Sequence, residues 1–140
     1  MKYWKILVLV LFLLALDFLS KYLFCDLWIW KESFLLEPVI NHGISWGISA
    51  NLYFVILVSF LWLWAFILLW KKKIIGDWIF IYLIARTLWN LCDRIFLWGV
   101  RDFISIWTFP VFNLADSYLT IAVGLIIIEE LLKLKNKKKD

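Results

Sequence analysis

The sequence has few of the residues that bind metals. Its 140 residues include two cysteines, Cys25 and Cys92, and one histidine, His42. Because a zinc site takes several Cys, His or carboxylate ligands close together, this set makes no metal centre, and no cofactor is expected. The spacing of the cysteines leaves a disulfide open, although a buried packing role is common for such thiols. An isolated histidine is typical of a surface or hydrogen-bonding residue.

Basic residues are scarce in two stretches that connect apolar segments. Residues 25–51 have only Lys31, and residues 99–113 have only Arg101. Apart from Lys21, which lies within the first segment, the other lysines flank the apolar segments, at positions 2 and 5, at 71–73, and between 133 and 139. An excess of lysine marks the cytoplasmic flanks of membrane spans. The net charge of +4 therefore indicates membrane topology, and no nucleic-acid partner is expected.

Polar residues are a minority, since 65% of the chain is hydrophobic and 20% is aromatic. A soluble domain of this length could not bury so much apolar surface, so the expected solvent is a bilayer. Segments at about 4–24, 52–70, 74–98 and 114–132 are long enough to cross it as helices. We expect one all-α membrane domain over residues 1–140, with four transmembrane helices and both termini cytoplasmic. The first span lacks a small-x-small cleavage site after it and is expected to be retained.

Polar residues inside these segments recur at helical spacing. Asp17 and Lys21 are four residues apart, which predicts a structural ion pair on one helix face. The third segment carries a polar stripe that should face the bundle interior or a wet cavity. Its members are Arg86, Asn90, Asp93 and Arg94. An internal Asp93–Arg94 pair is one interpretation, and the stripe as a whole is open to a structural or a chemical role.

Two aspartates, Asp102 and Asp116, lie at opposite ends of one short connection. An unpaired carboxylate beside lipid is unfavourable unless it is protonated or partnered. Phe109–Pro110 favours a turn that would bring the two together. Two adjacent carboxylates share one proton and can activate a water and protonate a leaving amine. The alternative for Asp116 is a capping acid in the first turn of the last helix, with Asn113 as the N-cap.

Five short boxes keep a fixed order along nearly the whole chain. They are Asp17-Phe-Leu-Ser20-Lys21, Asn41-His-Gly43-Ile-Ser-Trp46-Gly47, Asn90-Leu-Cys-Asp93-Arg94, Val100-Arg-Asp102-Phe-Ile104 and Phe112-Asn113-Leu-Ala115-Asp116-Ser117. Together they resemble the lipoprotein signal peptidase (signal peptidase II) family, aspartic proteases of bacterial membranes. The resemblance implies a four-helix membrane bundle with a small extracytoplasmic β-element. The extended piece suggested by Pro38-Val39-Ile40 agrees with that element.

The resemblance also implies a site and a substrate. Asp102 and Asp116 match the catalytic pair, and Asp17 and Lys21 match a structural polar pair. Positions that shape or support the site are Asn41, Gly43, Asn90, Arg94, Asn113 and Ala115. The implied substrate is a prolipoprotein with a diacylglyceryl group on its cysteine, cut just before that cysteine. The enzyme would lie in the lipid of the bacterial cytoplasmic (inner) membrane, with its site toward the outside, and we expect a monomer.

A few positions depart from the family pattern. Trp89 stands where glycine usually precedes Asn90, and Arg86-Thr87 replace small residues a turn earlier. A bulky indole implies altered packing or a narrower groove, and Arg101 would lower the pKa of a neighbouring acid. Two other functions stay open: a non-catalytic paralogue that binds lipoprotein signal peptides, and a small transporter or channel subunit. The chain has no internal repeat to support a transporter.

Overall fold

The computed structural model describes residues 1–27, 35–43 and 51–137. These residues form the helices α1 (Tyr3–Lys21), α2 (Leu52–Lys71), α3 (Asp77–Leu97) and α4 (Leu114–Lys137). Helix α1 continues into a π-helical turn, η1 (Tyr22–Asp26). The strands β1 (Leu36–Asn41), β2 (Val100–Ile106) and β3 (Phe109–Phe112) form one antiparallel sheet. The described part of the chain is thus mostly helical with a small sheet, as expected.

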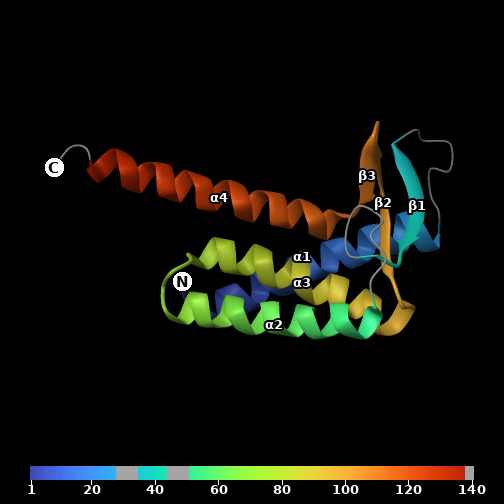
Figure 1. The fold of residues 1–140 in the computed structure, drawn as a ribbon, viewed down its shortest axis with the longest axis horizontal. Coiled ribbons are helices and arrows are strands. Elements are labelled where there is room, and N and C mark those ends of the chain that lie inside the picture. Colours follow the sequence, from blue (N-terminus) through green and yellow to red (C-terminus); the bar gives the residue numbers. More distant parts are fainter. Residues whose placement is uncertain (28–34, 44–50, 138–140) are drawn as a thin grey trace.

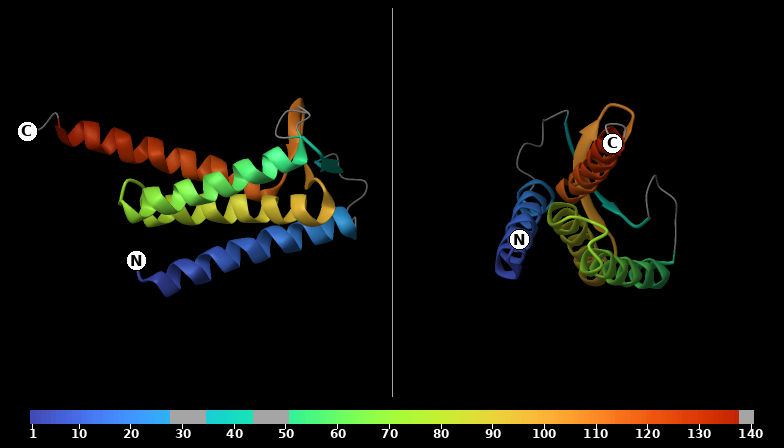
Figure 2. Two further views of the ribbon diagram at one scale, coloured as in Figure 1. Left: turned by 60° about the horizontal axis from the view of Figure 1, so that its bottom comes forward. Right: turned by 90° about the vertical axis from the view of Figure 1, so that its left-hand side faces the viewer.

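Helix α3 is the central element of the bundle. It contacts α1, α2 and α4, while β2 follows it directly in sequence. The sheet lies at one end of the helices, and the N-terminus, the α2–α3 connection and the C-terminal end of α4 lie at the other (Figures 1 and 2). Helix α4 leans away from the other helices toward its C-terminal end (Figure 1). This arrangement puts the described lysines at positions 2, 5, 71–73 and 133–137 at the end opposite the sheet.

Helix α3 is buried on more than one side, which fits its central position. Its residues Ile79, Ile81, Leu83 and Ala85 are buried, and Trp70 of α2 stacks on Phe80 with 4.4 Å between ring centroids. The helix begins three residues later than the predicted 74 because the chain turns first. Lys73 has a positive φ of 57°, and Gly76 precedes the helix in an extended conformation.

Two helical segments of the described residues are long and apolar enough to cross a membrane. They are Tyr3–Asp26 and Leu52–Lys71. Helices α3 and α4 carry acidic and basic side chains that weaken the same signal, including Asp93 and Glu129. Composition therefore marks α1 and α2, and the four-span topology with cytoplasmic termini stays a prediction.

The sheet corrects one detail of the predicted connection. Its order is β1-β2-β3, so both prolines, Pro38 and Pro110, lie in edge strands, where the missing N–H leaves the central ladder intact. The turn predicted at Phe109–Pro110 lies instead at 107–108, where Trp107 has a φ of 48°. Phe109 is already paired with Ile106 across the hairpin. Proline is tolerated early in an edge strand, so it did not mark the turn.

A close backbone contact joins the end of α3 to β1. Trp98 ends the helix in the left-handed conformation, with a φ of 61°. At Gly99 a Cβ would lie 2.6 Å from Cγ2 of Ile40 and 3.2 Å from the carbonyl oxygen of Asn41. A glycine is therefore needed for β1 to lie this close to the start of β2. In the β1–β2 ladder Asn41 pairs with Val100, and its side chain reaches the carboxylate of Asp102 two residues further along β2.

Candidate active site

A cleft of about 1080 Å³ opens between the sheet, the C-terminal half of α3 and the N-terminal part of α4. Its polar lining includes Arg86, Asn90 and Arg94 from α3, and Asn41, Asp102 and Asp116 from β1, β2 and α4. Apolar side chains of the sheet and of α4 line the rest, among them Ile40, Val100, Phe112, Leu119 and Ile121. The cleft thus combines apolar walls with a small cluster of acids, amides and arginines.

Asp102 forms a buried part of the cleft wall. Its carboxylate accepts one hydrogen bond from Nδ2 of Asn113 at 2.7 Å and another from Nδ2 of Asn41 at 3.0 Å. Only 2% of the residue is exposed. Burial raises the pKa of Asp102 to about 6, against the hydrogen bond from Asn41 and with a further contribution from the negative charge of Asp116. Asp102 is therefore an acid that can hold a proton near neutral pH.

Asp116 lies in the first turn of α4 and uses its two carboxylate oxygens differently. Oδ2 accepts a hydrogen bond from the backbone N–H of Asn113 at 3.4 Å, while Oδ1 of Asn113 accepts one from the N–H of Asp116 at 3.0 Å. This reciprocal pair is a capping box, so the predicted N-cap is confirmed. Oδ1 of Asp116 accepts hydrogen bonds from Arg86 and Asn90, both at 3.3 Å. Asp116 is therefore a capping acid through Oδ2, as the alternative interpretation predicted, and its Oδ1 remains on the cleft side.

Asn113 joins the two aspartates. Its side chain is fully buried, and it donates to Asp102 while it caps the N–H of Asp116. Nδ2 of Asn113 also lies 3.2 Å from Oδ1 of Asn90 and 3.3 Å from the carbonyl oxygen of Arg101. One amide thus orders both acids, and the predicted convergence of Asp102 and Asp116 on one site is confirmed as geometry.

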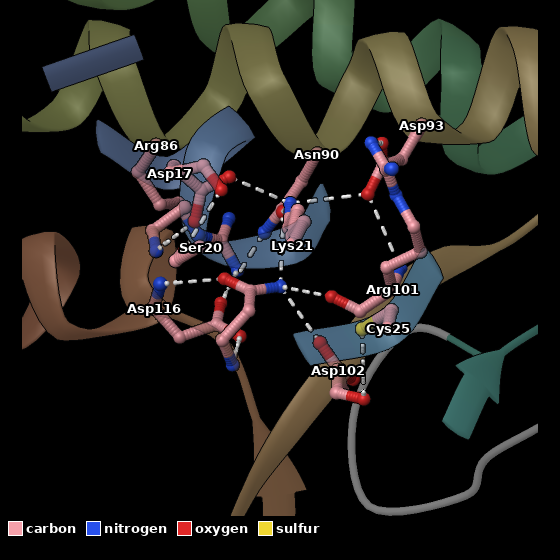
Figure 3. A network of polar contacts seen from close by, with 12 residues as sticks. Asp17, Ser20, Lys21, Cys25, Arg86, Asn90, Asp93, Arg101, Asp102 and Asp116 are labelled. Carbon is pink, nitrogen blue, oxygen red and sulfur yellow. Dashed lines mark hydrogen bonds and ion pairs between the residues drawn. The ribbon is translucent and has the colours of Figure 1, made fainter. Parts of the chain in front are cut away.

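A second polar cluster lies directly behind the site (Figure 3). Lys21 forms the predicted ion pair with Asp17 at 2.7 Å and also pairs with Asp93 at 3.1 Å. Arg101 pairs with Asp93 at 2.9 Å and with Asp26 of η1 at 2.7 Å. We call these five residues the charge network. Nζ of Lys21 also donates to Asn90 at 3.1 Å, which connects the network to the site.

The predicted Asp93–Arg94 pair is wrong. Adjacent residues on a helix point in different directions, so the two side chains diverge. Asp93 turns to Lys21 and Arg101, whereas Arg94 donates to the carbonyl oxygens of Asn90 at 3.3 Å and of Gly43 at 3.4 Å. Arg94 therefore supports the backbone beside the cleft, and Asp93 belongs to the structural network.

The supporting residues named from the sequence lie around the two aspartates. Oδ1 of Asn41 accepts a hydrogen bond from the N–H of Gly43 at 2.9 Å, which fixes the amide that faces Asp102. The N–H of Ala115 donates to Asp17 at 2.8 Å and fastens the start of α4 to α1. His42 bonds the carbonyl oxygen of Trp98 at 3.0 Å, as a hydrogen-bonding residue should. Positions 44–47 of the second box lie outside the described residues.

The departures from the family pattern have different outcomes. Trp89 packs edge-on against Phe18 of α1, with ring centroids 5.4 Å apart, and is absent from the cleft lining. It alters helix packing but does not narrow the groove. Arg101 points away from Asp102 toward Asp93 and Asp26. Although burial lowers it, the hydrogen bond that Arg101 donates to Asp93 raises the pKa of Arg101, so this arginine stays charged within the network.

Three contacts of the site were missed from the sequence. Asp26 reaches Arg101 from a position 75 residues away, and only the fold brings η1 onto β2. The thiol of Cys25 lies 3.8 Å from the carbonyl oxygen of Asp102, and Phe24 packs on Phe103 at 5.1 Å. Cys25 and Cys92 are both free, so the disulfide left open by their spacing is not formed.

Comparison with known proteins agrees with this geometry. The family model described as signal peptidase (SPase) II matches residues 9–132. A lipoprotein signal peptidase of Rickettsia felis is 33% identical, over 86% of this chain and 71% of the relative, and one of Rickettsia africae is 33% identical, over 86% and 69%. A solved structure of a bacterial membrane enzyme at 2.3 Å resolution has a TM-score of 0.83 and 29% identity, covering 99% of this chain and 94% of the other. The chain therefore belongs to the signal peptidase II family.

Proposed function

We propose that this chain cleaves the signal peptide from diacylglyceryl-modified prolipoproteins, with Asp102 and Asp116 as its catalytic pair. The observation that carries the proposal is the bridge of Asn113, which donates to Asp102 and caps the N–H of Asp116 in one cleft. The names of the curated relatives support the reaction class. Family membership also favours a peptidase over the transporter alternative.

The chemistry requires one proton shared by the two acids. A water between them attacks the carbonyl carbon of the scissile bond, and the ionised carboxylate takes its proton. The protonated acid donates a hydrogen bond to the carbonyl oxygen and stabilises the charge that develops there. When the C–N bond breaks, the acid that accepted the proton from water returns it to the leaving amine. The products are the free signal peptide and a lipoprotein whose first residue is the modified cysteine.

The surface of the bundle supports a location in the membrane. Helix α2 presents large apolar side chains outward, among them Leu57, Leu61 and Trp64, each more than half exposed. Such a continuous apolar face needs lipid or a partner around it. We infer four spans within one domain of residues 1–140, with both termini in the cytoplasm. The sheet and the cleft then lie on the outer side of the bacterial cytoplasmic membrane, where a translocated precursor presents its lipidated cysteine.

The apolar walls of the cleft suit this substrate. Ile40, Phe112 and Ile121 line it close to the two aspartates. A signal peptide entering from the membrane is apolar up to its cleavage site, so it would bury its side chains there. The acyl chains of the modified cysteine can remain in the surrounding lipid. No partner beyond this substrate and membrane lipid is required, and we infer a monomer.

The test uses the purified chain in lipid nanodiscs with two synthetic precursors that differ only in the diacylglyceryl group. We expect cleavage of the lipidated precursor just before its cysteine, detected by mass spectrometry, and little cleavage of the unmodified one. Asp102→Asn and Asp116→Asn should each abolish it. Normal processing by either variant would remove that residue from the catalytic pair.

The same experiment separates the non-catalytic alternative. Arg86 occupies one oxygen of Asp116, and this contact is the observation that favours a protein that binds signal peptides without cutting them. Saturable binding of the lipidated precursor by the unmodified chain, with no product after long incubation, would establish that alternative. Turnover of the precursor would exclude it.

A further inference from the structure

Arg86 places a positive charge directly on one member of the aspartate pair (Figure 3). Its Nη2 lies 3.3 Å from Oδ1 of Asp116, and the two side chains are 28% and 29% exposed. Among the described residues, Asp116 is the hydrogen-bond acceptor of Arg86, and Nε of the arginine is buried without a partner. The guanidinium is therefore committed to this carboxylate.

Asp102 has a different set of neighbours. Its hydrogen-bond donors are the neutral amides of Asn41 and Asn113, and the residue is almost fully buried. Hydrogen bonds from neutral amides favour the carboxylate less than a guanidinium does, and at Asp102 burial outweighs them, so the pKa of this acid is raised. A guanidinium strongly favours the carboxylate. The surroundings of Asp102 thus permit a protonated acid, whereas those of Asp116 favour the carboxylate, although both acids contact Asn113.

Among the described residues, the other cations near the pair form no ion pair with either aspartate, although the charge of Arg94 acts on both. Lys21 of α1 is paired with Asp17 and Asp93. Arg94 of α3 donates to backbone carbonyl oxygens, and His42 of β1 bonds the carbonyl oxygen of Trp98. Within the described residues, Arg86 is the cation in direct contact with the pair. The acids that line the same cleft are Asp116 of α4, which contacts Arg86, and Asp102 of β2.

We propose that Arg86 is a positioning residue that keeps Asp116 ionised, so that Asp102 carries the shared proton before water attacks. The inference rests on the proposed function. In the reaction, the oxygen of water bonds to the scissile carbonyl carbon, and Oδ1 or Oδ2 of Asp116 takes a proton from that water. The carboxylic acid of Asp102 donates to the carbonyl oxygen. Asp116 then gives its proton to the leaving amine, which restores the ion pair with Arg86.

The test is the pH profile of kcat/KM for the nanodisc enzyme with the lipidated precursor, in the unmodified chain, Arg86→Met and Arg86→Lys. The unmodified chain should lose activity above pH about 6, as Asp102 gives up its proton. In Arg86→Met the acidic limb should move to higher pH by about one unit, because the stabilising cation is lost. Arg86→Lys keeps the positive charge, so its acidic limb should return most of the way to the pH of the unmodified chain. Lys133→Met, an exposed change on α4, is the matched control and should leave the profile unchanged.

Two outcomes would overturn the inference while the proposed function stands. One is an acidic limb that does not move in Arg86→Met. The other is movement of the basic limb instead, which would place the shared proton on Asp116. If the unmodified chain cleaves nothing at any pH, the proposed function and this inference both fall.

A second measurement does not depend on how well the Arg86 variants fold. Infrared difference spectra of the unmodified chain at pH 5 should contain the carbonyl band of a protonated carboxylic acid. Asp102→Asn should remove this band, and Asp116→Asn should retain it. Loss of the band in Asp116→Asn alone would contradict the assignment.

Discussion

Two neighbouring clusters of this molecule use the same residue types in opposite ways. In the charge network, the carboxylates of Asp17 and Asp93 each face Lys21, and neither residue is more than 3% exposed. In the site, Asp102 and Asp116 face amides and one arginine and border an open cleft. Buried carboxylates that are paired with cations hold structural elements together. Carboxylates that lack a full set of cationic partners and are open to water can exchange protons.

The two clusters are connected by Asn90. Its Oδ1 accepts a hydrogen bond from Lys21, and so its Nδ2 must point the other way, toward Asp116. The structural network thereby fixes the orientation of an amide in the site. The difference between the clusters predicts which changes affect stability, which affect cleavage, and which affect both.

The largest expected effect is on cleavage with the fold intact. Asp102→Asn and Asp116→Asn preserve shape and should each lower kcat by about 10²–10⁴-fold, the usual contribution of general acid–base catalysis. Thermal unfolding in detergent should change little. Glu37→Gln, an exposed acid on β1, is the control and should cleave normally. If either variant unfolds at a much lower temperature than the unmodified chain, that aspartate is required for the fold.

The opposite result is expected from the charge network. Lys21→Met leaves Asp17 and Asp93 without their shared cation, and removing one partner of a buried ion pair destabilises by about 3–5 kcal/mol. Denaturant unfolding in detergent measures the loss. Lys133→Met breaks the exposed pair with Glu130 on α4 and should change nothing measurable. Equal stability of the two variants would show that the network is not structural.

Local patterns in the sequence predicted the parts of this comparison that depend on a single helix. The Asp17–Lys21 pair follows from a spacing of four residues, and the Asn113 cap follows from its place before an apolar run. The four predicted segments lie where the helices are, within a few residues at most ends. The five boxes identified the family, which the family model and relatives confirm.

The parts that depend on tertiary contacts could not be predicted in the same way. The partners of Asp93 come from α1 and from β2, and Asp26 reaches Arg101 through the packing of η1. The side on which Trp89 lies was equally open, because an indole can point to a groove or to a neighbouring helix. Spacing decides which residues share a face, while the identity of the facing element comes only from the fold.

A smaller effect should separate the two roles of Asn113. Asn51 caps α2 through the N–H groups of Tyr53 and Phe54, so it is a matched cap outside the site. Asn51→Ala and Asn113→Ala should each lose about 1 kcal/mol of cap stabilisation. Only Asn113→Ala also leaves a buried oxygen of Asp102 without its donor, which costs about 1–3 kcal/mol.

The measurement for this pair is kcat together with thermal unfolding. We expect kcat to fall by roughly ten- to a hundredfold in Asn113→Ala, in proportion to the lost hydrogen bond, and to stay unchanged in Asn51→Ala. If both variants lose only stability, Asn113 is a helix cap and does not order the aspartate pair.

The smallest effect tests how the sheet holds its part of the site. In Gly99→Ala the new methyl group would lie 2.6 Å from Cγ2 of Ile40, whose exposed side chain can move, and 3.2 Å from the carbonyl oxygen of Asn41, which can move less. We expect a loss of about 1 kcal/mol, at the low end for added core volume, and a several-fold lower kcat as Asn41 shifts from Asp102. Gly124→Ala is the control, since its Cβ meets nothing within 4 Å and alanine favours the helix. The two alanines should therefore change stability in opposite directions, and a neutral Gly99→Ala would mean that β1 reaches Asp102 without the close contact at the end of α3.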